Sequence, residues 1–293
     1  MNTPAVEESK PNAHQLLLDA LEKCWKDYRK ELKRCRTEFS DEAVHDLRVA
    51  TRRMLALVEL LNSISPRTRL EKVTDFFKDQ LNEFDDLRDT QVMLAEISEV
   101  LHELPQLQGF EKHLQSTEKE ILRTVHKKIK KFETSGLTKS IHKTQQSIEE
   151  EVSNGLESQT MQAVDDAYFL TRQRLGWVDP TRSATIHRVR VAFKSFRYMV
   201  EIIHPLLKDY PTENLKRMND YQSLMGEIQD AEVFIQTLAD YSESTSFPDP
   251  EPVRHYYEDR HAEAISAYLK DMNQLNTFWR PAPDQPFPWE KPE

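Results

Sequence analysis

Glycine is scarce in this sequence, with five residues among 293. So few glycines exclude the glycine-rich loops that cradle nucleotide phosphates. Aromatic and β-branched runs with period-two alternation are also absent, which argues against a β-sheet. By contrast, Glu, Lys, Leu and Gln are abundant, and 38% of the residues are hydrophobic. The sequence therefore predicts an all-α protein with a sizeable core.

Cysteines and long apolar runs are equally limited. Cys24 and Cys35 lie on one predicted helix, about 16 Å apart along its axis, which is too far for a disulfide. No apolar run approaches the length of a membrane span, and no signal-peptide pattern follows the polar N-terminal residues. We therefore expect no membrane association and a location in the reducing cytoplasm.

Positive charge does not dominate the chain, whose formal net charge is −10 at pH 7. A general attraction to polyanions is therefore not expected, and local patches decide which partner binds. The strongest basic run, Lys119 to Lys143, holds eight Lys or Arg residues against two Glu. Arg123, Lys127 and Lys131 share one helix face there, which forms either a solvent-facing surface or one wall of a binding site.

Two stretches of the chain carry the same cationic pattern, a His followed by an Arg after three residues and a second cation after seven. Positions i, i+3 and i+7 fall within roughly 60° of one another on a helix, so each set lies on one face. Apolar residues recur on the opposite face of both predicted helices. The two sets are His45, Arg48 and Arg52, and His187, Arg190 and Lys194.

The spacing between these two halves is nearly constant. His187 follows His45 by 142 residues, and Asp230 follows Asp89 by 141. This period is much longer than that of a solenoid repeat. It predicts an internal duplication, with two pseudo-symmetric helical bundles facing each other across a pseudo-two-fold axis. The bundles cover residues 12–152 and 156–280 of one composite domain, and a proline-rich tail covers 281–293.

Capping and breaking residues predict approximate helix ends. Ser40 is the predicted N-cap of the first motif helix, and Asp89 is predicted to begin the helix that ends near Leu104. In the second half, Gly226 is expected to interrupt or end a helix, and Asp230 to begin the next one. Asp89 and Asp230 are then helix N-caps; the alternative is that they orient a motif arginine through a salt bridge.

Metal binding and catalysis find little support in the sequence. Each motif offers one His among cations, which repel a metal ion, and no four ligands stand at zinc-site spacing. Ser195 and Cys35 lack the neighbours that would mark a nucleophile. We expect no metal, no cofactor and no enzymatic activity. A phosphohydrolase is the alternative, and it predicts phosphate release with a divalent metal.

The cationic stripes suit an extended anion. Arg binds phosphate oxygens in a fork, Lys adds a point charge, and His donates from its ring nitrogens. In the second stripe the donors extend from His187 to Arg197, about 15 Å, and Tyr198 adds a hydroxyl group. A single stripe of this kind is commonly a solvent-facing surface. The duplication at matched spacing favours a binding site for a long, regular anion.

Residues 41–53 and 187–198 resemble the two motifs of the CHAD family, histidine-containing α-helical domains known as polyphosphate-binding modules. The second stretch follows the family pattern His-x-x-Arg-x-x-x-Lys-x-x-Arg-Tyr. The resemblance covers roughly residues 12–280. Two positions depart from the pattern: Asp85 stands where glycine is usual, and Ser195 aligns with Arg53.

The resemblance implies that inorganic polyphosphate binds, without being cleaved, in a basic groove or pore between two helical bundles. It also implies association with polyphosphate granules. The implied binding residues are His45, Arg48, Arg52, Arg53, His187, Arg190, Lys194, Arg197 and Tyr198, with Lys78 and Arg88. Arg123, Lys127 and Lys131 join this prediction from the basic run alone.

The alternative function is that of a helical scaffold, which binds an acidic protein or RNA through the same cationic face. Proteins that bind RNA commonly combine a net positive patch with aromatic platforms on which bases stack. The negative net charge and the scarcity of such platforms make nucleic acid the less favoured partner.

Overall fold

The computed structural model describes residues 12–150, 155–245, 247 and 250–290. Within these ranges all regular secondary structure is helical, which confirms the all-α prediction. The predicted boundary at residue 152 and the last three residues of the predicted tail lie outside the described residues. Among the described residues, no helix combines the length and apolar character that crossing a membrane requires.

The helices follow one another with short connections. In chain order they are α1 (Ala13–Thr37), α2 (Asp41–Ile64), α3 (Thr68–Asn82), α4 (Asp85–Val100), η1 (Pro105–Leu107), α5 (Gln108–Lys131), α6 (Ser135–Glu150), α7 (Leu156–Leu175), α8 (Ser183–Ile203), η2 (His204–Leu206), α9 (Glu213–Ser244), α10 (Glu251–Asp271) and η3 (Met272–Thr277).

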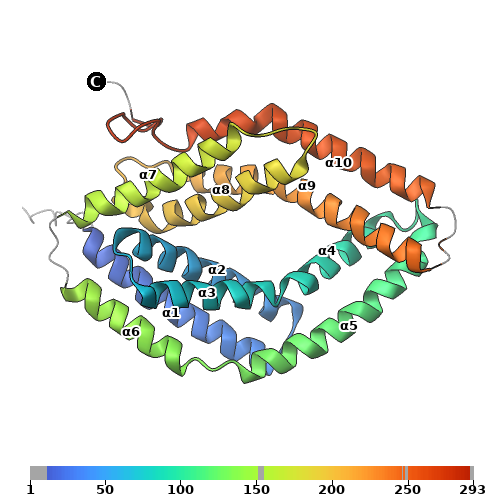
Figure 1. Cartoon of the computed structure of the whole chain (residues 1–293), viewed down its shortest axis with the longest axis horizontal. Helices are drawn as coiled ribbons and strands as arrows, with labels where there is room; N and C mark the ends of the chain where they lie inside the picture. The colour runs from blue at the N-terminus through green and yellow to red at the C-terminus, as the bar shows by residue number, and fades with distance from the viewer. Residues whose placement is uncertain (1–11, 151–154, 246, 248–249, 291–293) are drawn as a thin grey trace, which may run out of the picture.

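The two motif helices, α2 and α8, lie in the middle of the molecule (Figure 1). Helices α1 and α3 pack against α2, and α6 packs against both of them. Helices α7 and α9 pack against α8, while α10 packs against α9. The two groups meet because α2 contacts α7 and α8 directly and α4 contacts α9.

Helix α2 begins as its sequence predicts. The Ser40 hydroxyl accepts a hydrogen bond from the Ala43 amide at 3.2 Å, which satisfies one of the free donors at the helix start. Asp41 and Glu42 occupy the first turn, where negative charge favours the helix dipole. The predicted apolar face, from Leu47 to Leu61, is buried.

Two predicted helix boundaries are wrong. Helix α4 begins at Asp85 instead of Asp89, and α9 runs without a break through Gly226 and Asp230. A glycine inside a helix costs about 1 kcal/mol, which the burial of neighbouring side chains such as Met225 more than offsets. Asp89 and Asp230 therefore lie inside helices, where their carboxylates are not N-caps.

One main hydrophobic core includes residues of both halves. Leu57 and Phe77 from the first half and Phe193 and Tyr221 from the second are completely or almost completely buried in it. A second, smaller core joins α4, η1 and α5 to α9 and α10 at the far end of the molecule, visible on the right in Figure 1. Because α4 and α9 contribute to both the contact between the halves and this second core, they are fixed along much of their length.

Helices α2 and α8 are tied together by two side-chain contacts. The Arg53 guanidinium donates to Glu201 at 3.1 Å, and the Ser195 hydroxyl donates to Glu59 at 3.2 Å. Residue numbers rise along one helix as they fall along the other, so the helices run antiparallel. The two contacts are equivalent under the 142-residue offset, because Arg53 corresponds to Ser195 and Glu59 corresponds to Glu201.

The segment after η3 is anchored by a buried carboxylate on α7. Asp165, only 1% exposed, accepts hydrogen bonds from the Trp279 indole N–H at 2.7 Å and from Arg280 at 2.9 and 2.6 Å. Beyond Arg280, the described residues to 290 contain no helix, although Phe287 and Trp289 still stack on each other and contact Trp279.

Replacing Asp165 by Asn should lower the free energy of unfolding by about 2 kcal/mol, because the partly buried Arg280 guanidinium loses its charged partner. Urea unfolding followed by tryptophan fluorescence measures this loss. Asp166→Asn is the matched control, since Asp166 is exposed and its replacement should leave the unfolding midpoint almost unchanged. Equal stability of the two variants would contradict the anchoring role.

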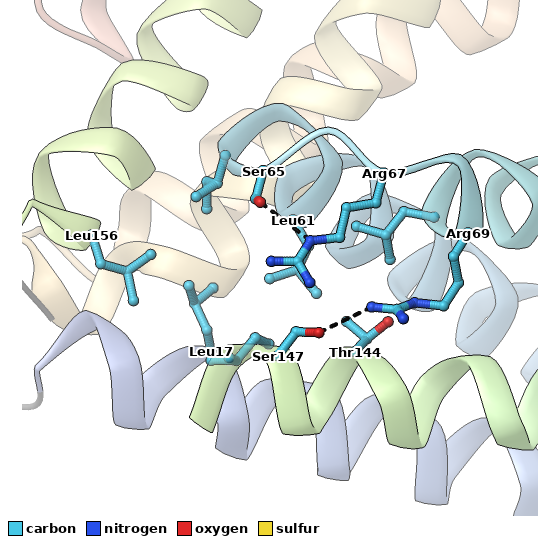
Figure 2. A pocket seen from close by; sticks show the side chains of 11 residues that line it. Leu17, Leu61, Ser65, Arg67, Arg69, Thr144, Ser147 and Leu156 are labelled. Carbon is cyan, nitrogen blue, oxygen red and sulfur yellow. Dashed lines mark hydrogen bonds between the residues drawn. The ribbon is translucent and has the colours of Figure 1, made fainter. Parts of the chain in front are cut away.

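A small pocket lies among the helices of the first half, and its lining is mostly apolar. Figure 2 shows it between α1, the end of α2, the start of α3 and α6, with Leu17, Leu61 and Leu156 on its wall. The Arg69 guanidinium donates to Ser147 at 3.1 Å and so ties α3 to α6. None of the predicted binding residues lines this pocket.

Candidate anion-binding site

Three cations from α2 and α8 form the centre of the candidate site. They are Arg52, Arg190 and Lys194, which we call the cation cluster. None of the three has a carboxylate within ion-pair distance among the described residues. Buried or half-buried cations are normally paired, because removing a charge from water is costly. A set of this kind is suited to bind an anion.

Lys194 shows how closely these charges lie to one another. Burial above all, together with the positive charges of Arg52, Arg190 and Arg48, lowers the pKa of its ammonium group from 10.5 to about 7. The carboxylate of Asp85 opposes that change only in part. At neutral pH the Lys194 side chain therefore carries a charge in only about half of the molecules.

Arg190 has a buried donor without a partner. Its Nε lies buried and makes no hydrogen bond to any described residue. Burial lowers the Arg190 pKa, an effect that the charges of Arg88 and Arg52 reinforce and that of Asp230 opposes. The neighbouring backbone is that of Gly226 on α9, where a methyl group would lie 4.0 Å from Arg190 Nε. An unsatisfied buried donor is costly, and a phosphate oxygen is a suitable acceptor for it.

Arg48 corresponds to Arg190 in the first half but is already paired. Its guanidinium, 6% exposed, donates to the carboxylate of Asp85 at 3.0 Å and to the Leu81 carbonyl at 3.4 Å. Burial and the charge of Arg52 lower the Arg48 pKa, whereas Asp85 raises it. The two motif arginines therefore have different electrostatic surroundings.

Arg88 joins the two halves through two carboxylates, those of Asp89 and Asp230. It donates to both oxygens of Asp230 on α9, at 2.7 and 2.9 Å, and to its neighbour Asp89 at 2.8 Å. Asp89 and Asp230 are not N-caps; they take the role predicted as the alternative, a salt bridge to an arginine, and hold Arg88 across the contact between α4 and α9. Their matched offset was the signal that could have indicated a shared role.

The two histidines stand near the N-terminal ends of the motif helices. Both are exposed, and His187 Nδ1 is hydrogen-bonded to Gln229 on α9. Gln229 follows Arg88 by 141 residues, so the two residues occupy corresponding positions in the two halves. The first half has an arginine at this position, and the second half has the glutamine that contacts His187.

The other predicted residues of α2, α3 and α8 already have partners within the protein. Arg197 donates to Gln222 at 3.0 Å and lies over the Tyr198 ring at 4.3 Å. Tyr198 lines a separate pocket toward α1, together with Arg53 and Glu201. Lys78 is exposed and pairs with Glu59 at 3.1 Å.

The basic run on α5 stands apart from these residues. Arg123, Lys127 and Lys131 are exposed, and α5 packs against α1, α4 and η1. Within the described residues, no hydrogen bond or ion pair connects these three cations to the cation cluster. The structure brings together residues of α2, α4, α8 and α9 and leaves this run on a solvent-facing surface.

Comparisons with known proteins identify the family. A family model of the CHAD domain matches residues 19–239, which is 221 of the 293 residues. The crystal structure of the CHAD domain from the plant Ricinus communis is similar to this chain with a TM-score of 0.63 and 16% sequence identity, over 94% of this chain and 93% of that one. At that identity the likeness shows the fold alone. No curated protein matches the chain. Because the family model covers most of the sequence, the chain belongs to the CHAD domain family.

Proposed function

We propose that this protein binds inorganic polyphosphate through the cation cluster, without cleaving it. The observation that carries the proposal is the group of unpaired, partly buried cations on two facing helices. A phosphate chain supplies oxygens that accept from the Arg190 Nε donor and oppose the charges of Arg52 and Lys194. Membership of the CHAD family supports this choice of anion.

A chain of phosphates fits the arrangement better than one phosphate ion. Along α8 the donors from His187 to Arg197 extend over about 15 Å, and α2 contributes Arg52 from the other half. The two matched contacts, Arg53 with Glu201 and Ser195 with Glu59, support a two-fold relation between the halves. A linear anion of repeating charge matches such a row of donors.

The protein acts in this proposal as a binding module located in the cytoplasm, where polyphosphate granules are a plausible target of the same surface. Its net charge of −10 confines attraction for the polymer to the site, since the rest of the molecule repels it. The alternative, binding of RNA or an acidic protein through this face, uses the same cations but requires contacts beyond phosphate.

Titration of long-chain polyphosphate into the protein, followed by calorimetry, tests the function. We expect saturable binding that weakens as salt rises, with a log-log slope of about −0.7 for each phosphate contact if single-stranded nucleic acid is a guide. RNA at equal phosphate concentration should not displace the polymer, and no phosphate should be released in the presence of Mg²⁺. Displacement by RNA would favour the alternative, and release would indicate a phosphohydrolase.

A further inference from the structure

The two motif arginines occupy matching positions but meet different groups on the neighbouring helix. Arg190 follows Arg48 by 142 residues, and Gly226 follows Asp85 by 141. Arg48 contacts Asp85, and Arg190 lies beside Gly226. At equivalent places in the two halves, one arginine faces a carboxylate and the other faces a residue without a side chain.

The Asp85 carboxylate covers the guanidinium that it binds. The Arg48 side chain is 6% exposed, whereas that of Asp85 is 54% exposed, so the carboxylate lies on the solvent side of the pair. Its oxygen accepts from Arg48 Nη2 at 3.0 Å, which is the kind of contact that a phosphate oxygen would make. An anion from solution therefore reaches Arg48 only by displacing this carboxylate.

The other half has no such competitor. Gly226 places no side chain beside Arg190, and the buried Arg190 Nε has no acceptor among the described residues. Asp230, the carboxylate with the largest effect on the Arg190 pKa, already accepts hydrogen bonds from both Nη1 and Nη2 of Arg88. The site is thus electrostatically asymmetric although its cations are duplicated.

We propose that Asp85 is a built-in competitor for polyphosphate, which occupies Arg48 and confines strong phosphate binding to Arg190 and Lys194 on α8. This proposal rests on the proposed polyphosphate binding and assigns a specificity-determining role to a residue that does not itself bind the ligand. The competitor lowers affinity for a polymer that would otherwise contact cations of both halves at once.

The test replaces Asp85 by Asn, which keeps the shape and removes the charge. Polyphosphate affinity should rise about tenfold at fixed salt, because the phosphate no longer displaces a charged partner from Arg48. Asp86→Asn is the matched control: Asp86 lies in the same first turn of α4, is exposed, and makes no ion pair with a described residue. It changes the net charge equally and should alter affinity no more than about twofold.

The reciprocal change places a competitor in the second half. Gly226→Asp adds a carboxylate next to Arg190, where a Cβ meets only the Nε atom at an ordinary contact distance of 4.0 Å. Affinity should fall about tenfold or more, whereas Gly226→Ala, which fills the space without charge, should have a smaller effect. Circular dichroism and thermal unfolding confirm that the four variants are folded before binding is compared.

The possible results separate this inference from the proposed function. If wild type binds polyphosphate and Asp85→Asn behaves like Asp86→Asn, the competitor role is wrong and the function stands. A double variant gives a second check, because in an Arg48→Gln background Asp85→Asn should lose its additional effect. If neither wild type nor any variant binds, the proposed function itself is overturned, and the inference falls with it.

Discussion

Replacement of Arg190 and Lys194 by Gln is expected to weaken polyphosphate binding about a thousandfold. Each cation offers the ligand a charge-assisted hydrogen bond worth about 2 kcal/mol, and two such losses correspond to about three powers of ten in affinity. The unliganded protein should remain folded, because neither residue makes an ion pair within the described residues. Calorimetric titration at two salt concentrations measures both the loss and the reduced salt dependence.

The control for this variant removes the same charge elsewhere. Arg123→Gln with Lys127→Gln takes two cations from the exposed face of α5. If only the cluster binds, this variant should lose less than about threefold in affinity through weaker long-range attraction. A loss as large as that of the α8 variant would place the basic run of α5 in the site and contradict our assignment of the centre.

Polyphosphate affinity should fall about tenfold between pH 7 and pH 9, if the Lys194 charge contributes about 2 kcal/mol to binding. In the unliganded protein the pKa of Lys194 is about 7, so its charge disappears over this range. A bound polyanion favours the charged form and raises that pKa, and binding above pH 7 must therefore take up a proton. Only when the pH is well below 7 is the lysine charged in nearly every unliganded molecule, and it then contributes no further dependence. The charged groups that act on Lys194 are Arg48, Arg52, Arg190 and Asp85.

Lys194→Arg is the matched variant for the pH experiment. Arginine keeps its charge throughout this range, so affinity should remain nearly constant from pH 7 to pH 9. Titrations in two buffers of different ionisation enthalpy would reveal proton uptake by the wild type and none by the variant. An identical pH profile for both proteins would show that Lys194 is not the titrating group.

The sequence was sufficient to predict the helices that carry the motifs. Apolar residues at helical spacing specify the buried face of α2, and the position of Ser40 specifies its start. These are local signals, because each depends on residues a few positions apart. The cationic stripes followed from the same periodicity, and α2 and α8 do contact each other.

Which cations are free to bind an anion could not be predicted, because their partners lie far away in the chain. Arg53 pairs with Glu201 across 148 residues, and Arg88 pairs with Asp230 across 142. Local rules instead assigned Asp89 and Asp230 to helix starts and Gly226 to a break. In the fold, tertiary packing keeps α9 continuous through these positions.

A crystal structure of the protein with bound polyphosphate tests the central claim most directly. We predict density for a phosphate chain along α8, with a phosphate oxygen about 2.9 Å from Arg190 Nε and another near Lys194. The Asp85–Arg48 pair should remain closed in that complex. A chain bound along α5, with Arg190 Nε still without an acceptor, would contradict the account.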